Sequence, residues 1–246
     1  MLELRKINFK YCHSKSNKDI CIFNNFGLTI KTNEFVAIVG PSGCGKSTLI
    51  NLIAGYLKPQ VGEIILRGKV LTSPGMDRTV ISQQDDLFFW LTVRENLELV
   101  IQSKELIEKY LDVLGLVYFG NMYPGELSGG MKKKLILARA LASDGDFVLM
   151  DEPFSALDNN LKEKLHLELL ALKKCSRKTF LLVTHDIEEA LFLSDRIIVL
   201  NSDTPTSIEK EFLVQYGSER NLEIKQRQNF FEFKNEFLRC FRLCDL

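Results

Sequence analysis

The feature that most limits the fold is a glycine-rich loop between an apolar run and a helical segment. Phe35–Val39 is continuously apolar, as expected for a strand buried on both faces of a parallel or mixed sheet. The next eight residues, Gly40–Ser47 (GPSGCGKS), match the pattern G-x-x-x-x-G-K-[ST]. A helical pattern then runs from Lys46 to about Tyr56. This order predicts an α/β domain with a phosphate-binding loop at the carboxyl end of a strand.

The residue types in this loop suit phosphate chemistry. Glycines let successive backbone N–H groups turn toward an anion, and the positive end of the following helix strengthens that field. We expect Lys46 to reach the β- and γ-phosphates of a nucleotide and the Ser47 hydroxyl to bind Mg²⁺. The expected phosphate-binding residues are Gly40, Pro41, Ser42, Gly43, Cys44, Gly45, Lys46, Ser47 and Thr48. A glycine turn that binds nothing is the alternative, and the Lys-Ser pair with its flanking strand and helix argues against it.

Two adjacent carboxylates follow a second apolar strand. Phe147–Met150 is apolar, and Asp151 and Glu152 come directly after it. In P-loop enzymes the first carboxylate at such a strand end holds Mg²⁺, and we expect Asp151 to do so. Glu152 is then available to activate the attacking water as a general base. A plain surface turn is the alternative, which the upstream phosphate loop disfavours.

Three further segments resemble motifs of the ATPases of ABC transporters. Leu127–Met131 (LSGGM) resembles the signature motif, and Asp151–Asp158 (DEPFSALD) resembles the second nucleotide motif running into the D-loop. Val183–Asp186 (VTHD) resembles the segment that carries the switch histidine, here His185. The resemblance covers roughly residues 1–200 in the family's order. It implies ATP and Mg²⁺ as ligands and ATP hydrolysis as the activity.

The resemblance implies three groups of site residues. The catalytic group comprises Glu152, His185 and Gln83. The magnesium group comprises Ser47, Gln83 and Asp151. The nucleotide group adds to the phosphate loop Tyr11, which stacks on adenine, and the signature residues Leu127, Ser128, Gly129, Gly130 and Met131. Gln84 directly follows Gln83, so the choice of the Q-loop glutamine stays open between the two.

The signature segment also bears on assembly. A Ser-Gly-Gly turn that opens a helix is a second phosphate cradle, which one chain does not need for its own ATP. In the family, the signature of one subunit covers the ATP on the P-loop of the other. The resemblance therefore implies a homodimer that buries two ATP molecules and closes when ATP binds.

The segment Phe88–Asn96, which contains the only Trp, helps to choose among kinds of ABC protein. It resembles the nitrate, sulfonate and taurine group of bacterial importers, in which this region receives a short helix from the membrane subunit. We expect part of this apolar cluster to be exposed. The resemblance implies a separate transmembrane permease and, indirectly, a periplasmic or surface solute-binding protein. The alternative is the ATPase of an exporter or of a cell-division or signalling complex. A soluble ABC protein of DNA repair would need a long coiled coil between the two nucleotide motifs, and one that acts on ribosomes would need a second nucleotide domain; the sequence has neither feature.

Composition excludes some function classes. Lys plus Arg and Asp plus Glu both number 32, and this balance argues against a general nucleic-acid binder. The apolar runs are far shorter than the ~20 residues of a spanning helix, and no signal segment opens the chain. The six scattered cysteines suggest reduced thiols. We therefore expect a peripheral protein on the cytoplasmic face of the inner (plasma) membrane.

We expect an ABC-type P-loop NTPase domain over residues 1–205, with a mixed β-sheet core flanked by helices. An antiparallel β subdomain and a helical insertion at about 86–141 complete it. Residues 206–246 form a Phe-rich tail, expected to be an amphipathic helix packed on the body. Two segments depart from the importer group. Lys132–Lys134 replaces a usual Gln-Arg and is expected to be a solvated helix face, and Asp203–Ser207 stands where a Pro-Gly-Arg turn is common.

Overall fold

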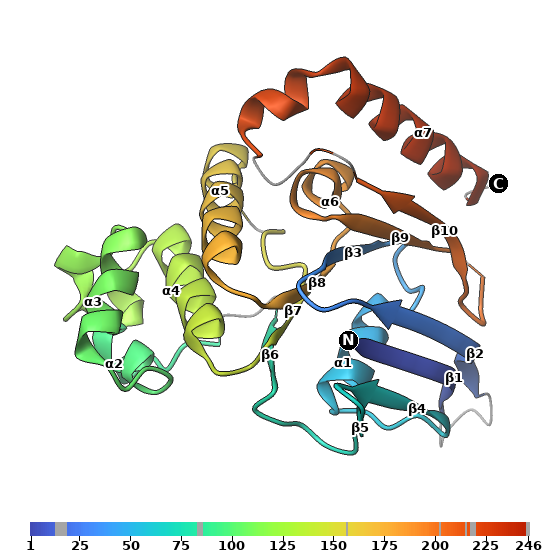
Figure 1. Ribbon diagram of the computed structural model, residues 1–246, viewed down its shortest axis with the longest axis horizontal. Helices are drawn as coiled ribbons and strands as arrows, with labels where there is room; N and C mark the ends of the chain where they lie inside the picture. The colour runs from blue at the N-terminus through green and yellow to red at the C-terminus, as the bar shows by residue number, and fades with distance from the viewer. Residues whose placement is uncertain are drawn as a thin grey trace. The chain divides into compact units, whose positions relative to one another are not determined.

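The phosphate loop follows the central strand of a parallel sheet, as the sequence predicts. In the computed structural model, β3 (Phe35–Val39) pairs in parallel with β8 (Thr179–Val183) on one side and β9 (Arg196–Leu200) on the other (Figure 1). All five residues of β3 are buried, which explains why none of them is polar. The structure describes residues 1–12, 19–82, 86–155, 157–201, 203–214, 216 and 220–244, without the side chains of residues 175 and 240–244.

The chain forms two compact units, residues 1–75 with 179–246 and residues 76–178. In the first unit the parallel strands lie in the order β9-β3-β8, and β10 (Ile208–Leu213) adds an antiparallel edge beside β9. Helix α1 (Lys46–Ala54) starts directly after the phosphate loop. It ends at Gly55, whose left-handed backbone lets its N–H bond to the last carbonyls of the helix.

A second, antiparallel sheet in the same unit has the order β2-β1-β4-β5. Its strands are β1 (Leu2–Tyr11), β2 (Ile20–Ile30), β4 (Val61–Leu66) and β5 (Lys69–Val70). Buried and exposed residues broadly alternate along β2, as expected for a sheet with one covered face. The predicted combination of a mixed sheet with an antiparallel β subdomain is confirmed.

The last part of the chain packs on the first unit. Here α6 (Ile187–Leu193), η3 (Leu222–Gln226) and α7 (Gln228–Cys244) cover one face of β3, β9 and β10. Figure 1 shows α7 in red alongside β10 and α6. One apolar cluster joins the strands, α6 and α7; it runs from Ala37 and Val39 through Leu191 and Ile197 to Phe237.

The second unit pairs β6 (Arg78–Ile81) in parallel with β7 (Phe147–Asp151). Its helices are α2 (Val93–Glu98), α3 (Lys104–Val113), α4 (Gly129–Ala142) and α5 (Asn159–Cys175), with the short turns η1 (Val117–Phe119) and η2 (Pro124–Glu126). Helix α2 begins at Val93, because Thr92 and Glu95 form a reciprocal capping box directly before it. In the described part of the chain, no helix is both long and apolar enough to span a membrane.

Candidate functional site

The glycines of the phosphate loop occupy positions that other residues cannot take without strain. Gly45 has φ 92°, and a Cβ there would lie 2.5 Å from the Cγ2 atom of Ile22. At Gly40 a Cβ would lie 2.8 Å from the Sγ atom of Cys44. Both distances are shorter than any ordinary contact. The loop can therefore follow this path only with glycine at these two positions.

Lys46 is folded across the loop from which it projects. Its Nζ donates to the carbonyl oxygens of Gly40 at 2.7 Å and Pro41 at 2.8 Å, and the side chain is buried. Ser47, the next residue, is exposed on the first turn of α1. The loop thus places the Lys46 ammonium next to the exposed Ser47 hydroxyl, a pair suited to phosphate and to a hard metal ion.

Tyr11 lies beside the same helix start. Its hydroxyl is 3.3 Å from Oγ1 of Thr48, and its ring is exposed while packing edge-on against Phe9. An exposed ring next to a phosphate loop can offer its face to a flat base. The structure therefore brings the predicted adenine-stacking residue into the neighbourhood of the predicted phosphate site.

Cys44 supports the loop through its backbone carbonyl, and its Sγ atom lies 4.0 Å from the Lys46 ammonium. Burial raises the pKa of the Cys44 thiol, and the nearby charge of Lys46 only partly opposes this effect. The thiol is therefore neutral and poorly reactive at neutral pH. The Cys44 carbonyl accepts a hydrogen bond of 2.7 Å from the Thr206 hydroxyl, and the Thr206 N–H donates to Ile22 at 2.7 Å.

Sequence reasoning missed Thr206 as a supporting residue of the phosphate loop. The side chain is buried, and its contact spans 162 positions of the chain. The one signal available was that Asp203–Ser207 departs from the turn usual in the importer group. The departure turns out to place a hydroxyl where it fixes the loop.

His185 stands at the same end of the sheet as the phosphate loop. Residues Ile38 and Val183 are register partners in the parallel pair β3–β8, and the Thr184 N–H bonds to the Ile38 carbonyl at 3.2 Å. The loop begins two residues after Ile38, and His185 comes two residues after Val183. His185 is exposed, and Asp186 caps α6 directly behind it. Ligands collect at this carboxyl end of parallel strands.

In the second unit, the two predicted carboxylates lie where β7 ends. Asp151 is its last residue, and Glu152 follows with φ 47°, a left-handed backbone for a residue with a Cβ. The Glu152 carbonyl accepts bonds from the Ser155 N–H at 3.3 Å and from the Ser155 hydroxyl at 3.0 Å. Such a strained backbone, held by its neighbours, is common among residues that act on a ligand.

The signature segment opens α4 as predicted. Ser128 caps the helix, and its hydroxyl accepts a 3.3 Å bond from the Met131 N–H. Gly129 is exposed with no neighbour where a Cβ would stand, whereas a Cβ at Gly130 would lie 2.7 Å from Leu161 of α5. One glycine therefore faces open space, and the other allows two helices to approach closely. Leu127, which precedes the cap, is buried.

The prediction that Lys132–Lys134 forms a solvated helix face is wrong. Lys133 is buried, and the Lys134 ammonium bonds to Glu168 at 2.7 Å and to the Leu114 carbonyl at 3.2 Å. The Lys132 ammonium stands 5.5 Å from the centre of the Phe89 ring. A run of three lysines spans most of a helical turn, so its members meet different neighbours.

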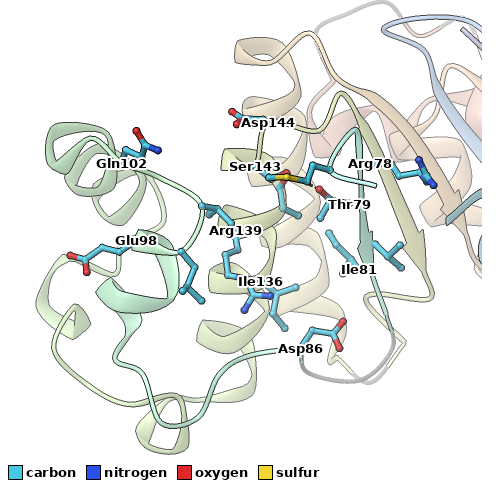
Figure 2. Close-up of a pocket in the computed structure, with 15 residues that line it drawn as sticks. Arg78, Thr79, Ile81, Asp86, Glu98, Gln102, Ile136, Arg139, Ser143 and Asp144 are labelled. Atoms are coloured by element: carbon cyan, nitrogen blue, oxygen red, sulfur yellow. Dashed lines mark hydrogen bonds between the residues drawn. The ribbon is translucent and has the colours of Figure 1, made fainter. Parts of the chain in front are cut away.

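The second unit also contains a pocket of about 480 Å³. Figure 2 shows Thr79 and Ile81 of β6 and Ile136 and Arg139 of α4 among the side chains that line it. Burial lowers the pKa of the Arg139 guanidinium, and the charge of Asp86 opposes the shift. The pocket therefore combines apolar walls with charged groups.

An exposed aromatic cluster adjoins Arg139, whose guanidinium stacks over the Phe88 ring at 5.0 Å. Phe89 is exposed, and Trp90 is 72% exposed. The prediction that part of the Phe88–Asn96 segment stays uncovered is confirmed. Gln83 and Gln84, the two candidates for the Q-loop glutamine, lie outside the described residues. Their role remains a prediction.

Comparisons with known proteins agree with these motifs. Residues 23–155 match the family described as "ABC transporter". The chain is 39% identical to the nitrate import ATP-binding protein NrtD of Synechocystis sp., over 96% of this chain and 92% of that protein. It is 40% identical to the taurine import ATP-binding protein TauB of Pelagibacter ubique, over 86% and 84%. A solved dimer of the ATP-binding cassette MJ0796 with ADP and Pi is 32% identical, with a TM-score of 0.73 over 88% of this chain and 100% of that one.

Proposed function

Because the chain belongs to the ABC transporter family, we propose that it is the ATP-hydrolysing subunit of an importer for a small solute of the nitrate, sulfonate or taurine kind. The observation that carries the proposal is the phosphate loop, in which Lys46 and Ser47 follow glycines that no other residue can replace. The names of the relatives, nitrate import and taurine import ATP-binding proteins, support the direction and the class of cargo.

ATP binding would begin with an exchange of partners at Lys46. Its ammonium now bonds to two loop carbonyls, and phosphate oxygens are stronger acceptors because they carry charge. The backbone N–H groups from Gly43 to Thr48 and the start of α1 supply the rest of the phosphate field. Tyr11 would stack on the adenine.

The residues present fit Mg²⁺, which prefers oxygen ligands and commonly combines one or two carboxylates with phosphate oxygens. We assign the exposed Ser47 hydroxyl and the Asp151 carboxylate to the ion, with Gln83 as a further ligand. When bound, Mg²⁺ would neutralise charge on the phosphates. Glu152 would accept a proton from the attacking water, and His185 would contact the γ-phosphate.

The signature segment supports pairing of two copies. Ser128, Gly129 and the start of α4 form a cradle of the kind that binds an anion at a helix N-terminus. We assign it to the ATP held by a second copy, so that ATP closes a homodimer and hydrolysis reopens it. The cassette dimer with ADP and Pi is a relative with such an assembly.

The exposed Trp90 cluster supports a permease as the next partner. Apolar side chains gathered beside a pocket favour a protein interface, and a short helix of a membrane subunit would suit it. The subunit would then work on the cytoplasmic face of the inner (plasma) membrane. A solute-binding protein would act through the permease, without touching this chain.

The test is the variant Glu152→Gln, which keeps the side-chain size and removes the base. We expect it to bind Mg-ATP, to hydrolyse it at least ~100-fold more slowly, and to accumulate as an ATP-bound dimer. Phosphate release and light scattering with size-exclusion chromatography measure these effects. Glu223→Gln, an exposed glutamate in η3, is the matched control and should behave as the parent. Normal hydrolysis by a Glu152→Gln protein that stays monomeric with ATP would overturn the proposal.

A further inference from the structure

A buried carboxylate lies just behind His185. Glu189 of α6 is 3% exposed and accepts a hydrogen bond from the hydroxyl of Thr184, which is 2% exposed. The Thr184 oxygen in turn accepts the N–H of Asp186 at 3.0 Å. The residues immediately before and after His185 are therefore joined through one hydroxyl, and that hydroxyl is tied to Glu189.

The same short segment is fixed from the other side by the helix cap. The Asp186 carboxylate accepts the N–H groups of Glu188 at 2.9 Å and Glu189 at 3.2 Å. Thr184 also continues the β3–β8 ladder, because its N–H bonds to the Ile38 carbonyl at 3.2 Å. His185 is thus the one exposed residue between a strand end and a helix start that are both held.

We propose that Glu189 is a positioning residue for His185, acting through Thr184. The carboxylate selects one rotamer of the Thr184 hydroxyl, and the hydroxyl selects one path of the backbone across His185. The imidazole then projects from the backbone in a fixed direction, at the end of the sheet where the phosphate loop begins. This inference rests on the proposed contact of His185 with the γ-phosphate.

Glu189 is almost fully buried although its side chain is a carboxylate. A carboxylate removed from water is stable only when hydrogen bonds compensate for its lost hydration. If this position served packing alone, an apolar side chain would do so without that cost. At the other end of α6, Ser194 is also buried, and its hydroxyl donates to the Ala190 carbonyl at 2.6 Å. That bond stabilises the helix without touching the segment around His185. Ser194→Ala is therefore a matched control from the same helix.

The test compares variants of the full chain by three measurements, namely kcat for ATP, the affinity for a non-hydrolysable ATP analogue, and the ring resonances of His185. The chain has only three histidines, so the spectrum of His185→Ala assigns those resonances. Glu189→Leu should lower kcat ~10- to ~100-fold, leave analogue affinity near the parent value, and shift the His185 resonances. Glu189→Gln keeps an acceptor for Thr184 and should restore kcat. Ser194→Ala should change neither kcat nor the resonances.

Should Glu189→Leu fail to fold, the double variant Thr184→Val with Glu189→Leu removes both side-chain partners together, so that the Thr184 hydroxyl is not left without its acceptor; only the Asp186 N–H loses the Thr184 oxygen. It should show the same loss of kcat and the same shift. Parent-like kcat and resonances in a folded Glu189→Leu or double variant would overturn the inference, as would an equal loss in Ser194→Ala. If His185→Ala hydrolyses ATP normally, the proposed contact with the γ-phosphate fails. The resonance shift then still decides whether Glu189 positions the ring.

Discussion

Gly43 and Gly45 have almost the same left-handed backbone, with φ 84° and 92°, but different surroundings. A Cβ at Gly43 would meet nothing within 4 Å, whereas at Gly45 it would overlap the stiff, β-branched Ile22. We expect Gly43→Ala to lower the free energy of unfolding by about 1–2 kcal/mol, the cost of a left-handed alanine. Gly45→Ala should lower it by about 1–3 kcal/mol more and weaken ATP-analogue binding. Denaturant unfolding and analogue titration measure both, and equal losses would contradict the role given to Ile22.

At the residue scale, the sequence placed correctly those motifs whose surroundings are local in the chain. The phosphate loop, the Asp151–Glu152 pair and the Ser128 cap are short motifs whose neighbours in the chain are also their neighbours in space. Thr206 could not be found this way, because its partner Cys44 is far away in the sequence. The environment of Lys133 was wrongly predicted for the same reason, since burial of a helix face depends on what packs against it.

At the scale of elements, α7 presents two phenylalanines that differ mainly in burial. Phe237 is 1% exposed and its ring centre lies 5.5 Å from that of Phe212 on β10, whereas Phe231 is 51% exposed. We expect Phe237→Ala to lower the free energy of unfolding of the first unit by about 3–5 kcal/mol. Phe231→Ala, the same change on the same helix, should stay within about 0.5 kcal/mol. Guanidinium unfolding followed by circular dichroism measures both, and similar losses would mean that α7 does not anchor through Phe237.

The elements that sequence predicted well are those with a strong apolar pattern. The buried strands β3 and β7 were recognised because they are short apolar runs. The prediction of a helical tail over residues 206–246 is wrong for Ile208–Leu213, which form the edge strand β10; only Phe212 of these six residues is buried, so no apolar run marks the strand.

At the scale of the whole molecule, the proposed homodimer determines which chain supplies each half of an ATP site. If the signature of one copy covers the ATP of the other, each site takes its phosphate loop and its signature from different chains. Lys46→Ala removes the phosphate ammonium, and Gly129→Asp adds a negative charge at an exposed position with room for a side chain. Each lesion should therefore disable one half of a site, and the Gly129 lesion should do so without disturbing α4.

Mixed dimers distinguish ATP sites shared between two chains from sites completed within one chain. They are made from two differently tagged chains and purified by both tags. When Lys46→Ala and Gly129→Asp are on different chains, both lesions fall in one shared site and the other site stays intact. When both lesions are on one chain, each shared site carries one of them. We therefore expect measurable ATP hydrolysis from the first mixture and at least ~100-fold less from the second, because a γ-phosphate without one of its cradles loses most of its transition-state contacts. Sites completed within a single chain would reverse this order, since the wild-type partner would then keep one whole site.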